Sequence, residues 1–145
     1  DKSLENFFNI EIILGFFPNA KFIHTYRNTN DAIMGIHQTL LTELSWSHKI
    51  KDIKNYVKIY NNVINYFSEK YPNKIINIEL NSFTNNKEAE TKRILEFCNI
   101  EVTNEFLNFE KNTTLFSKTN SFLQVRKKIE KYDDNKYQPY YYLLD

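Results

Sequence analysis

The sequence predicts an α/β fold, a three-layer arrangement in which helices flank a parallel sheet. Two short β-prone runs, over 21–26 and 75–79, alternate with stretches of helical periodicity. This alternation is typical of parallel strands joined by right-handed crossovers. A chain of 145 residues is long enough to bury a core of its own, so we expect a single domain over 1–145.

The first elements follow from local patterns. A helix is predicted over 4–17, capped by Ser3, and because it is apolar on most faces it should be buried. The run over 21–26 is short, apolar and β-prone, which is typical of a parallel strand covered on both faces. A helix over 30–41 and a loop over 42–49 are expected to follow.

The clearest helix is predicted over 50–70, where one stripe is apolar and the opposite face is basic and polar. The stripe consists of Ile53, Val57, Tyr60, Ile64 and Phe67. A strand over 75–79, a polar loop and a helix over 87–98 come next. One short helix is expected over 104–109, and core and edge packing explains the tyrosines of the tail better than base stacking does.

Composition narrows the classes of function. A formal net charge of +1 gives no reason to expect nucleic acid or an anionic membrane as a partner. No stretch reaches the roughly 18 apolar residues of a membrane span. The single cysteine, Cys98, cannot form an internal disulfide, and no Cys/His spacing suits a metal. His24 lies inside the first strand and is expected to be a satisfied core residue.

The end of the first strand has features of an anion site. Arg27 falls at the carboxyl end of this strand, where ligands gather in open α/β sheets. Asn28, Thr29 or Asn30 can cap the following helix, and Asp31 suits its first turn. A guanidinium can bind phosphate in a bidentate manner, and free N–H groups at a helix start attract anions. The stretch therefore indicates half of a phosphate-binding site.

Several segments, taken in order, resemble the sulfotransferase family. They are 1–7 (DKSLENF), 17–24 (FPNAKFIH), Arg27-Asn28 with Asp31, 88–98 (EAETKRILEFC) and 119–126 (TNSFLQVR). The most similar branch contains tyrosylprotein sulfotransferases and bacterial sulfotransferases fused to tetratricopeptide repeats. The resemblance implies a P-loop-type sulfotransferase fold that is partial here. With only two glycines the chain has no glycine-rich phosphate loop, so the family's loop would lie before Asp1.

The resemblance implies transfer of a sulfuryl group from 3′-phosphoadenosine 5′-phosphosulfate to a hydroxyl acceptor, which could be a protein tyrosine in a peptide, a carbohydrate or a small alcohol. This in-line displacement depends on positioning and on cations near the oxygens, and it requires no metal. The family's catalytic base would also lie upstream of Asp1, with Glu43 a conceivable substitute. A tetratricopeptide-repeat domain upstream and a cytoplasmic location are implied for the bacterial branch alone, so the compartment stays open.

Candidate site residues are carried over by the same resemblance. Lys2 and Ser121 match residues that face the transferring sulfuryl group. Arg27 matches the arginine that binds the donor's 3′-phosphate. Arg126 and Lys136 fall where the family's C-terminal region folds back over the cofactor, and Lys136-Tyr137 resembles a basic-aromatic pair near the 3′-phosphate. Each role has a plain structural alternative. Arg27 could be a surface arginine at a strand end, Lys2 a solvated terminal lysine, and Arg126 part of a solvated basic face.

Three positions depart from the family pattern. Gly35 stands in the 3′-phosphate subsite where the family usually has a serine, although a backbone N–H or a water could substitute for it. Leu80 replaces a tyrosine, and Thr39 replaces a basic residue. These departures keep two alternatives open. One is a catalytically inactive sulfotransferase-like binding module, and the other is a different P-loop-type transferase, such as a small-molecule kinase fragment.

Overall fold

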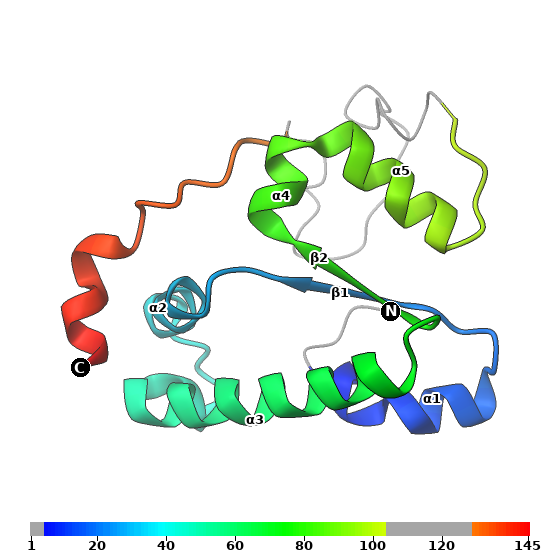
Figure 1. The fold of residues 1–145 in the computed structure, drawn as a ribbon. Coiled ribbons are helices and arrows are strands. Elements are labelled where there is room, and N and C mark those ends of the chain that lie inside the picture. The colour runs from blue at the N-terminus through cyan, green and yellow to red at the C-terminus, as the bar shows by residue number, and fades with distance from the viewer. Residues whose placement is uncertain (1–4, 104–128) are drawn as a thin grey trace. The chain divides into compact units, whose positions relative to one another are not determined.

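The computed structural model describes residues 5–103 and 129–145, and Figure 1 shows their helices and strands. The chain forms two compact units, one of Asp1–Asn77 with Asp133–Asp145 and one of Ile78–Tyr132. The described residues combine helices with a small parallel sheet of two strands, which is compatible with the predicted α/β class.

The elements follow the predicted order with several local differences. In the first unit they are η1 (Asn6–Asn9), α1 (Ile10–Phe16), β1 (Phe22–Tyr26), α2 (Thr29–Thr39), η2 (Ser45–His48), α3 (Ile50–Lys70) and β2 (Ile75–Glu79), with η4 (Gln138–Leu144) at the C-terminus. β2 crosses into the second unit, where α4 (Leu80–Asn85) and α5 (Lys87–Phe97) follow. The bounds of α3 and β2 are those predicted. The expected loop before α3 contains the 3-10 turn η2, and the expected polar loop after β2 forms α4.

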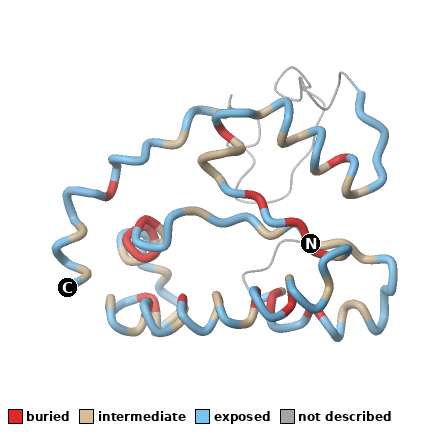
Figure 2. Tube along the Cα trace, in the orientation of Figure 1, coloured by how far each residue is buried: buried red, intermediate tan, exposed pale blue. Residues whose placement is uncertain are grey.

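The two strands differ in burial. Ile75, Ile76 and Ile78 make β2 the more buried strand, as the burial tube in Figure 2 shows for this part of the chain. On β1, Ile23 is 46 % exposed and Tyr26 is 43 % exposed. The prediction that the first strand is covered on both faces is therefore wrong. In the first unit, α1 and α3 pack on the face of β1 that carries Phe22, whereas Ile23 points to the other face.

A first hydrophobic cluster joins α1, α3 and the sheet. It consists of Phe7, Ile10, Ile64, Phe67 and Ile75, with Phe22 packed against it. The predicted burial of the first helix is wrong, because Ile12 is 60 % exposed and Phe16 is 76 % exposed. Only one side of α1 contacts the first hydrophobic cluster within the described residues. The apolar sequence on its other faces could not show which side that would be.

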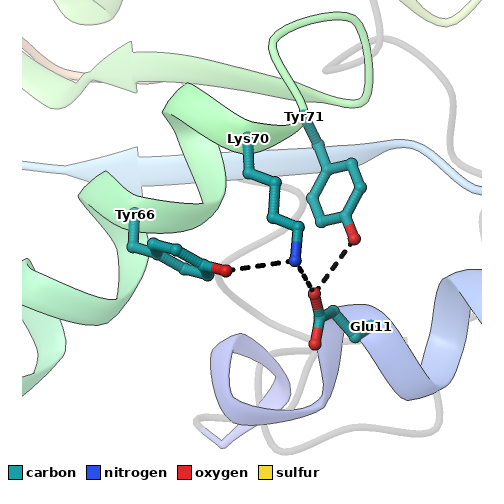
Figure 3. A network of polar contacts seen from close by, with 4 residues as sticks. All are labelled: Glu11, Tyr66, Lys70 and Tyr71. Carbon is teal, nitrogen blue, oxygen red and sulfur yellow. Dashed lines mark hydrogen bonds and ion pairs between the residues drawn. The ribbon is translucent and has the colours of Figure 1, made fainter.

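Polar contacts reinforce this packing at the end of α3 (Figure 3). The Lys70 ammonium donates to Glu11 Oε1 at 2.5 Å and to the Tyr66 hydroxyl oxygen at 3.0 Å, and the Tyr71 hydroxyl donates to the same Glu11 oxygen at 3.0 Å. The hydrogen bonds from Lys70 and Tyr71 lower the pKa of the Glu11 carboxyl, and Glu11 raises the pKa of Lys70. The network ties α1 to the last turn of α3.

A second hydrophobic cluster holds α2 on the N-terminal half of α3. Its buried members are Ile33, Ile53 and Val57, and Trp46 and Leu144 pack against them. The Trp46 ring also stacks on Tyr56 of α3, with a centroid separation of 3.7 Å and an interplanar angle of 2°. Because Leu144 belongs to η4, the C-terminal turn reaches the same cluster as α2.

The second unit is smaller. Leu95 is buried, and the Ser82 hydroxyl of α4 donates to Glu90 Oε1 of α5 at 3.1 Å. The buried Thr84 hydroxyl accepts a hydrogen bond from the Tyr132 backbone N–H at 3.0 Å. The helix predicted over 104–109 lies outside the described residues. Among the helices that the structure describes, none is both long enough and apolar enough to cross a membrane.

Candidate anion-binding site

The turn between β1 and α2 is built around Asn28. Its side-chain oxygen accepts hydrogen bonds from the backbone N–H groups of Asn30 at 2.9 Å and Asp31 at 3.3 Å. The predicted helix cap is therefore confirmed, with Asn28 as the capping residue. The same bonds occupy two N–H groups of the first turn. The expectation that free N–H groups at this helix start attract an anion is wrong for those two groups.

Arg27 lies across α2 at Gly35. A Cβ atom placed on Gly35 would be 2.2 Å from Arg27 Nη2 and 3.2 Å from Arg27 Cζ, so the guanidinium occupies the space that a side chain at Gly35 would need. The same position is 3.4 Å from the Tyr137 hydroxyl oxygen. The Arg27 Cζ atom is 5.7 Å from the centroid of the Tyr137 ring, within the range of a cation–π contact.

Within the part of the chain that the structure describes, the charge of Arg27 has no acidic partner. Over 5–103 and 129–145, no hydrogen bond or ion pair to another residue holds the Arg27 guanidinium. Lys136 adds a second cation, because its ammonium lies 5.0 Å from the centroid of the Tyr137 ring. Tyr137 itself is buried, with 7 % of its surface exposed. Two cations around one buried ring favour an anionic ligand that carries more than one negative charge.

Contacts from η4 fix the segment that carries Lys136 and Tyr137. The Tyr141 hydroxyl donates to Asp31 Oδ1 at 2.5 Å, and this bond raises the pKa of Tyr141 to about 12. Lys54 of α3 donates to the Leu144 backbone oxygen at 2.7 Å. The C-terminal turn is thus anchored to both α2 and α3. Asp31, which is 2 % exposed, serves this anchor.

The structure brings three of the predicted site residues together. Arg27, Gly35 and Lys136 surround Tyr137, as the distances above show. Three other candidates, Lys2, Ser121 and Arg126, lie outside the described residues, and their roles stay predictions.

The remaining departures from the family pattern have local contacts of their own. The Thr39 hydroxyl donates to the Gly35 backbone oxygen at 2.7 Å, and Leu80 opens α4 in the second unit. No group of three or more His, Cys, Asp or Glu side chains that could hold a metal ion occurs in the described ranges.

Sequence reasoning missed the Tyr141–Asp31 contact. The aromatic run at the C-terminus has no helical or strand period, so the sequence indicated general packing. The position of Asp31 in the first turn of a helix gave no sign of a partner 110 residues away. Asp31 is itself buried, and its partner comes from the tail.

His24 lies near the C-terminal end of β1, on the face of this strand that is covered by α3. Its Nδ1 atom is 2.7 Å from Asn77 Oδ1, and its Nε2 atom contacts the Tyr60 hydroxyl. A neutral ring with its proton on Nδ1 satisfies both partners. The prediction that His24 is satisfied is confirmed, but the residue is half-buried and does not belong to the buried core. Burial lowers the pKa of His24 and raises the pKa of Tyr60 to about 12.

The lowered pKa of His24 predicts a loss of stability at mildly acidic pH. In the unfolded chain the ring takes up a proton near pH 6.5, whereas in the folded protein it does so only at lower pH. The stabilisation that neutral His24 contributes to the folded state is fully present above about pH 6.5. It is lost as the pH falls through the pKa of His24 in the folded protein. Urea unfolding at about pH 7.5 and pH 5.5 should show this loss, and His24→Gln should reduce it.

The exposed His48 provides the matched control for this measurement. Its Nε2 atom is 3.2 Å from the Leu41 backbone oxygen. His48→Gln should keep the pH dependence of the wild-type protein. If His24→Gln and the wild-type protein lost the same free energy of unfolding between the two pH values, His24 would not be the responsible group.

Comparison with known proteins places these residues in a wider context. The sequence model of the sulfotransferase family matches residues 1–104, a range that contains Arg27 and Gly35. An uncharacterized protein from Aquifex aeolicus (strain VF5) is 28% identical over 144 residues, which cover 97% of this chain and 19% of that relative. The chain thus spans about a fifth of the length of this relative. No solved structure matches the chain.

Proposed function

The chain belongs to the sulfotransferase family, and from this premise we propose that it binds 3′-phosphoadenosine 5′-phosphosulfate and contributes to sulfuryl transfer onto a hydroxyl acceptor. The observation that carries the proposal is the Arg27 guanidinium, which has no acidic partner among the described residues and lies beside Lys136 and Tyr137. A guanidinium remains charged at all physiological pH values and can donate two parallel hydrogen bonds to phosphate. The donor's 3′-phosphate is the group that this pair of cations suits.

Five of the six candidate residues have a role in the proposed reaction. Arg27 holds the 3′-phosphate, and Lys136 supplies a second positive charge near it. Lys2 and Ser121 face the sulfuryl group, and Arg126 belongs to the segment that covers the cofactor. The acceptor oxygen attacks sulfur while the bond from sulfur to the 5′-phosphate oxygen breaks. The hydroxyl proton passes to a base, and adenosine 3′,5′-bisphosphate leaves.

The architecture of the whole enzyme is part of the same proposal. Residues 1–145 would form the C-terminal part of a three-layer, P-loop-type sulfotransferase domain, with the phosphate loop and the catalytic base contributed by chain before Asp1. A tetratricopeptide-repeat domain upstream would suit the bacterial branch. The match to the family and the parallel pairing of β1 with β2 support this architecture. The acceptor class, whether peptide, carbohydrate or small alcohol, is to be found by assay.

The test is a calorimetric titration of the full-length protein with adenosine 3′,5′-bisphosphate, adenosine 5′-phosphate and ATP with Mg²⁺. We expect micromolar binding of the bisphosphate and at least about tenfold weaker binding of the monophosphate, since the 3′-phosphate contacts charged groups. Stronger binding of ATP with Mg²⁺ would favour the kinase-type alternative. Transfer of labelled sulfate from the donor to tyrosine peptides, sugars or alcohols then identifies the acceptor. Donor binding without any transfer would indicate an inactive relative.

A further inference from the structure

We propose that Gly35 and Tyr137 position the Arg27 guanidinium from its two sides. On this view Gly35 is a fitted contact of the site, because the absence of a side chain at position 35 leaves the space that the Arg27 guanidinium occupies. The positioning itself rests on the contacts between these three residues. Its effect on a ligand rests on the proposed function, in which Arg27 binds the 3′-phosphate.

The contact at Gly35 is steric. A Cβ atom on this residue would lie 2.2 Å from Arg27 Nη2, and real Cβ atoms essentially never approach another heavy atom within 3.0 Å. Any side chain at position 35, the family's serine included, therefore excludes the guanidinium from its present place. The nearest atom belongs to the far end of a flexible side chain, so the arginine would move while the helix backbone stays. Gly35 has no positive φ, so alanine suits its backbone.

Tyr137 restricts the guanidinium from another direction. Its ring lies within cation–π distance of Arg27 Cζ, and its hydroxyl oxygen lies 3.4 Å from the point where a Gly35 Cβ would be. Tyr137 is 7 % exposed, and the Tyr141–Asp31 hydrogen bond anchors the turn that follows it. Among the described residues no hydrogen bond orients Arg27. The Arg27 guanidinium packs between the surface of α2 at Gly35, which has no side chain there, and the anchored Tyr137 ring. This packing therefore sets the position of the guanidinium before a ligand binds.

The first measurement is spectroscopic and needs no ligand. In a nitrogen-15-labelled full-length protein, the Nε–Hε resonance of Arg27 should shift in Gly35→Ala because the guanidinium is displaced. It should shift in Tyr137→Leu because the ring is lost, and Tyr137→Phe should restore most of the wild-type position. Gly15→Ala is the matched control, because nothing lies within 4 Å of a Cβ at Gly15. An unchanged Arg27 resonance in folded Gly35→Ala and Tyr137→Leu would overturn the proposal.

The second measurement is a double-mutant cycle on affinity for adenosine 3′,5′-bisphosphate. Gly35→Ala alone should weaken binding by about tenfold or more, because a misplaced guanidinium loses its charged hydrogen bonds. Lysine lacks the Nη2 atom, so in the Arg27→Lys background the same alanine should change the affinity by less than about twofold. Equal effects in both backgrounds would overturn the positioning role.

The two measurements separate this inference from the function on which it rests. If the wild-type protein bound no bisphosphate while the Arg27 resonance shifted as expected, the proposed function would fail and the positioning of Arg27 would stand. If the wild-type protein bound the bisphosphate and Gly35→Ala changed neither the resonance nor the affinity, the proposed function would stand and the positioning would be refuted.

Discussion

Replacing Arg27 with alanine should weaken the binding of adenosine 3′,5′-bisphosphate by about 10- to 150-fold. A hydrogen bond to a charged group contributes roughly 1.5–3 kcal/mol, and about 1.4 kcal/mol corresponds to a factor of ten in affinity. Arg27 has no ion pair within the described ranges, so its removal leaves none of the described carboxylates without a partner. The affinity change would then report the loss of ligand contacts. Calorimetry on the full-length protein at fixed ionic strength gives the two dissociation constants.

Two control variants sharpen this result. Arg93→Ala removes the same charge from a site on α5, where the guanidinium pairs with Glu90 at 2.7 Å, and it should leave the affinity unchanged. Arg27→Lys keeps a positive charge but cannot make the bidentate contact, so its affinity should fall between those of the wild-type and alanine proteins. Wild-type affinity in Arg27→Ala would show that the 3′-phosphate binds elsewhere.

Replacing Ile53 with alanine should lower the free energy of unfolding by about 2–5 kcal/mol, the usual cost of such a truncation in a core. Ile53 is 0 % exposed and packs with Ile33 of α2 and Val57 of α3. The cavity would open where α2 rests on α3, and the two helices can close it only in part. Urea unfolding followed by far-ultraviolet circular dichroism measures the change.

Ile59 is the matched control for the core variant because it lies on the same helix and is 52 % exposed. Ile59→Ala makes the same chemical change and should alter the free energy of unfolding by about 0.5 kcal/mol or less. Equal losses in Ile53→Ala and Ile59→Ala would mean that the cluster between α2 and α3 does not stabilise the folded state.

The elements that were predicted correctly are those in which the local residue pattern indicates both the type of the element and where it begins and ends. The helix over 50–70 has the observed bounds because its apolar stripe persists for its full length and Pro72 follows its end. The strand over 75–79 has three isoleucines and the observed bounds. Asn28, one of the three caps that the sequence allowed, caps α2, since a short polar side chain before a helix binds the first N–H groups.

The parts that were missed depend on tertiary contacts. Sequence could not show that α1 buries one side only, because nearly every face of that segment is apolar. The turn η4 has no period that would distinguish it from a loop, and α4 is only 6 residues long. Short elements of this kind are held by packing, which a local pattern does not record.

The candidate site divides in the same way. The resemblance matched Arg27, Gly35 and Lys136 separately to positions of the family and did not predict the contacts among them. The position of Arg27 at the end of a strand followed from the predicted sheet. That the guanidinium of Arg27 fills the space beside Gly35 depends on the direction of a long side chain across α2. Tyr137 comes from a segment 110 residues further along the chain, and no local rule predicts its approach.

The stack of Trp46 on Tyr56 gives the protein a built-in optical probe. Trp46 is the single tryptophan of the chain. When tryptophan is excited selectively, almost all of the fluorescence therefore originates beside the packing of α2 on α3. Fluorescence therefore reports the first unit and is silent about α4 and α5, whereas circular dichroism records the helices of both. Coincident unfolding curves from the two methods would mark a single cooperative transition, and separate curves would show that the units melt independently.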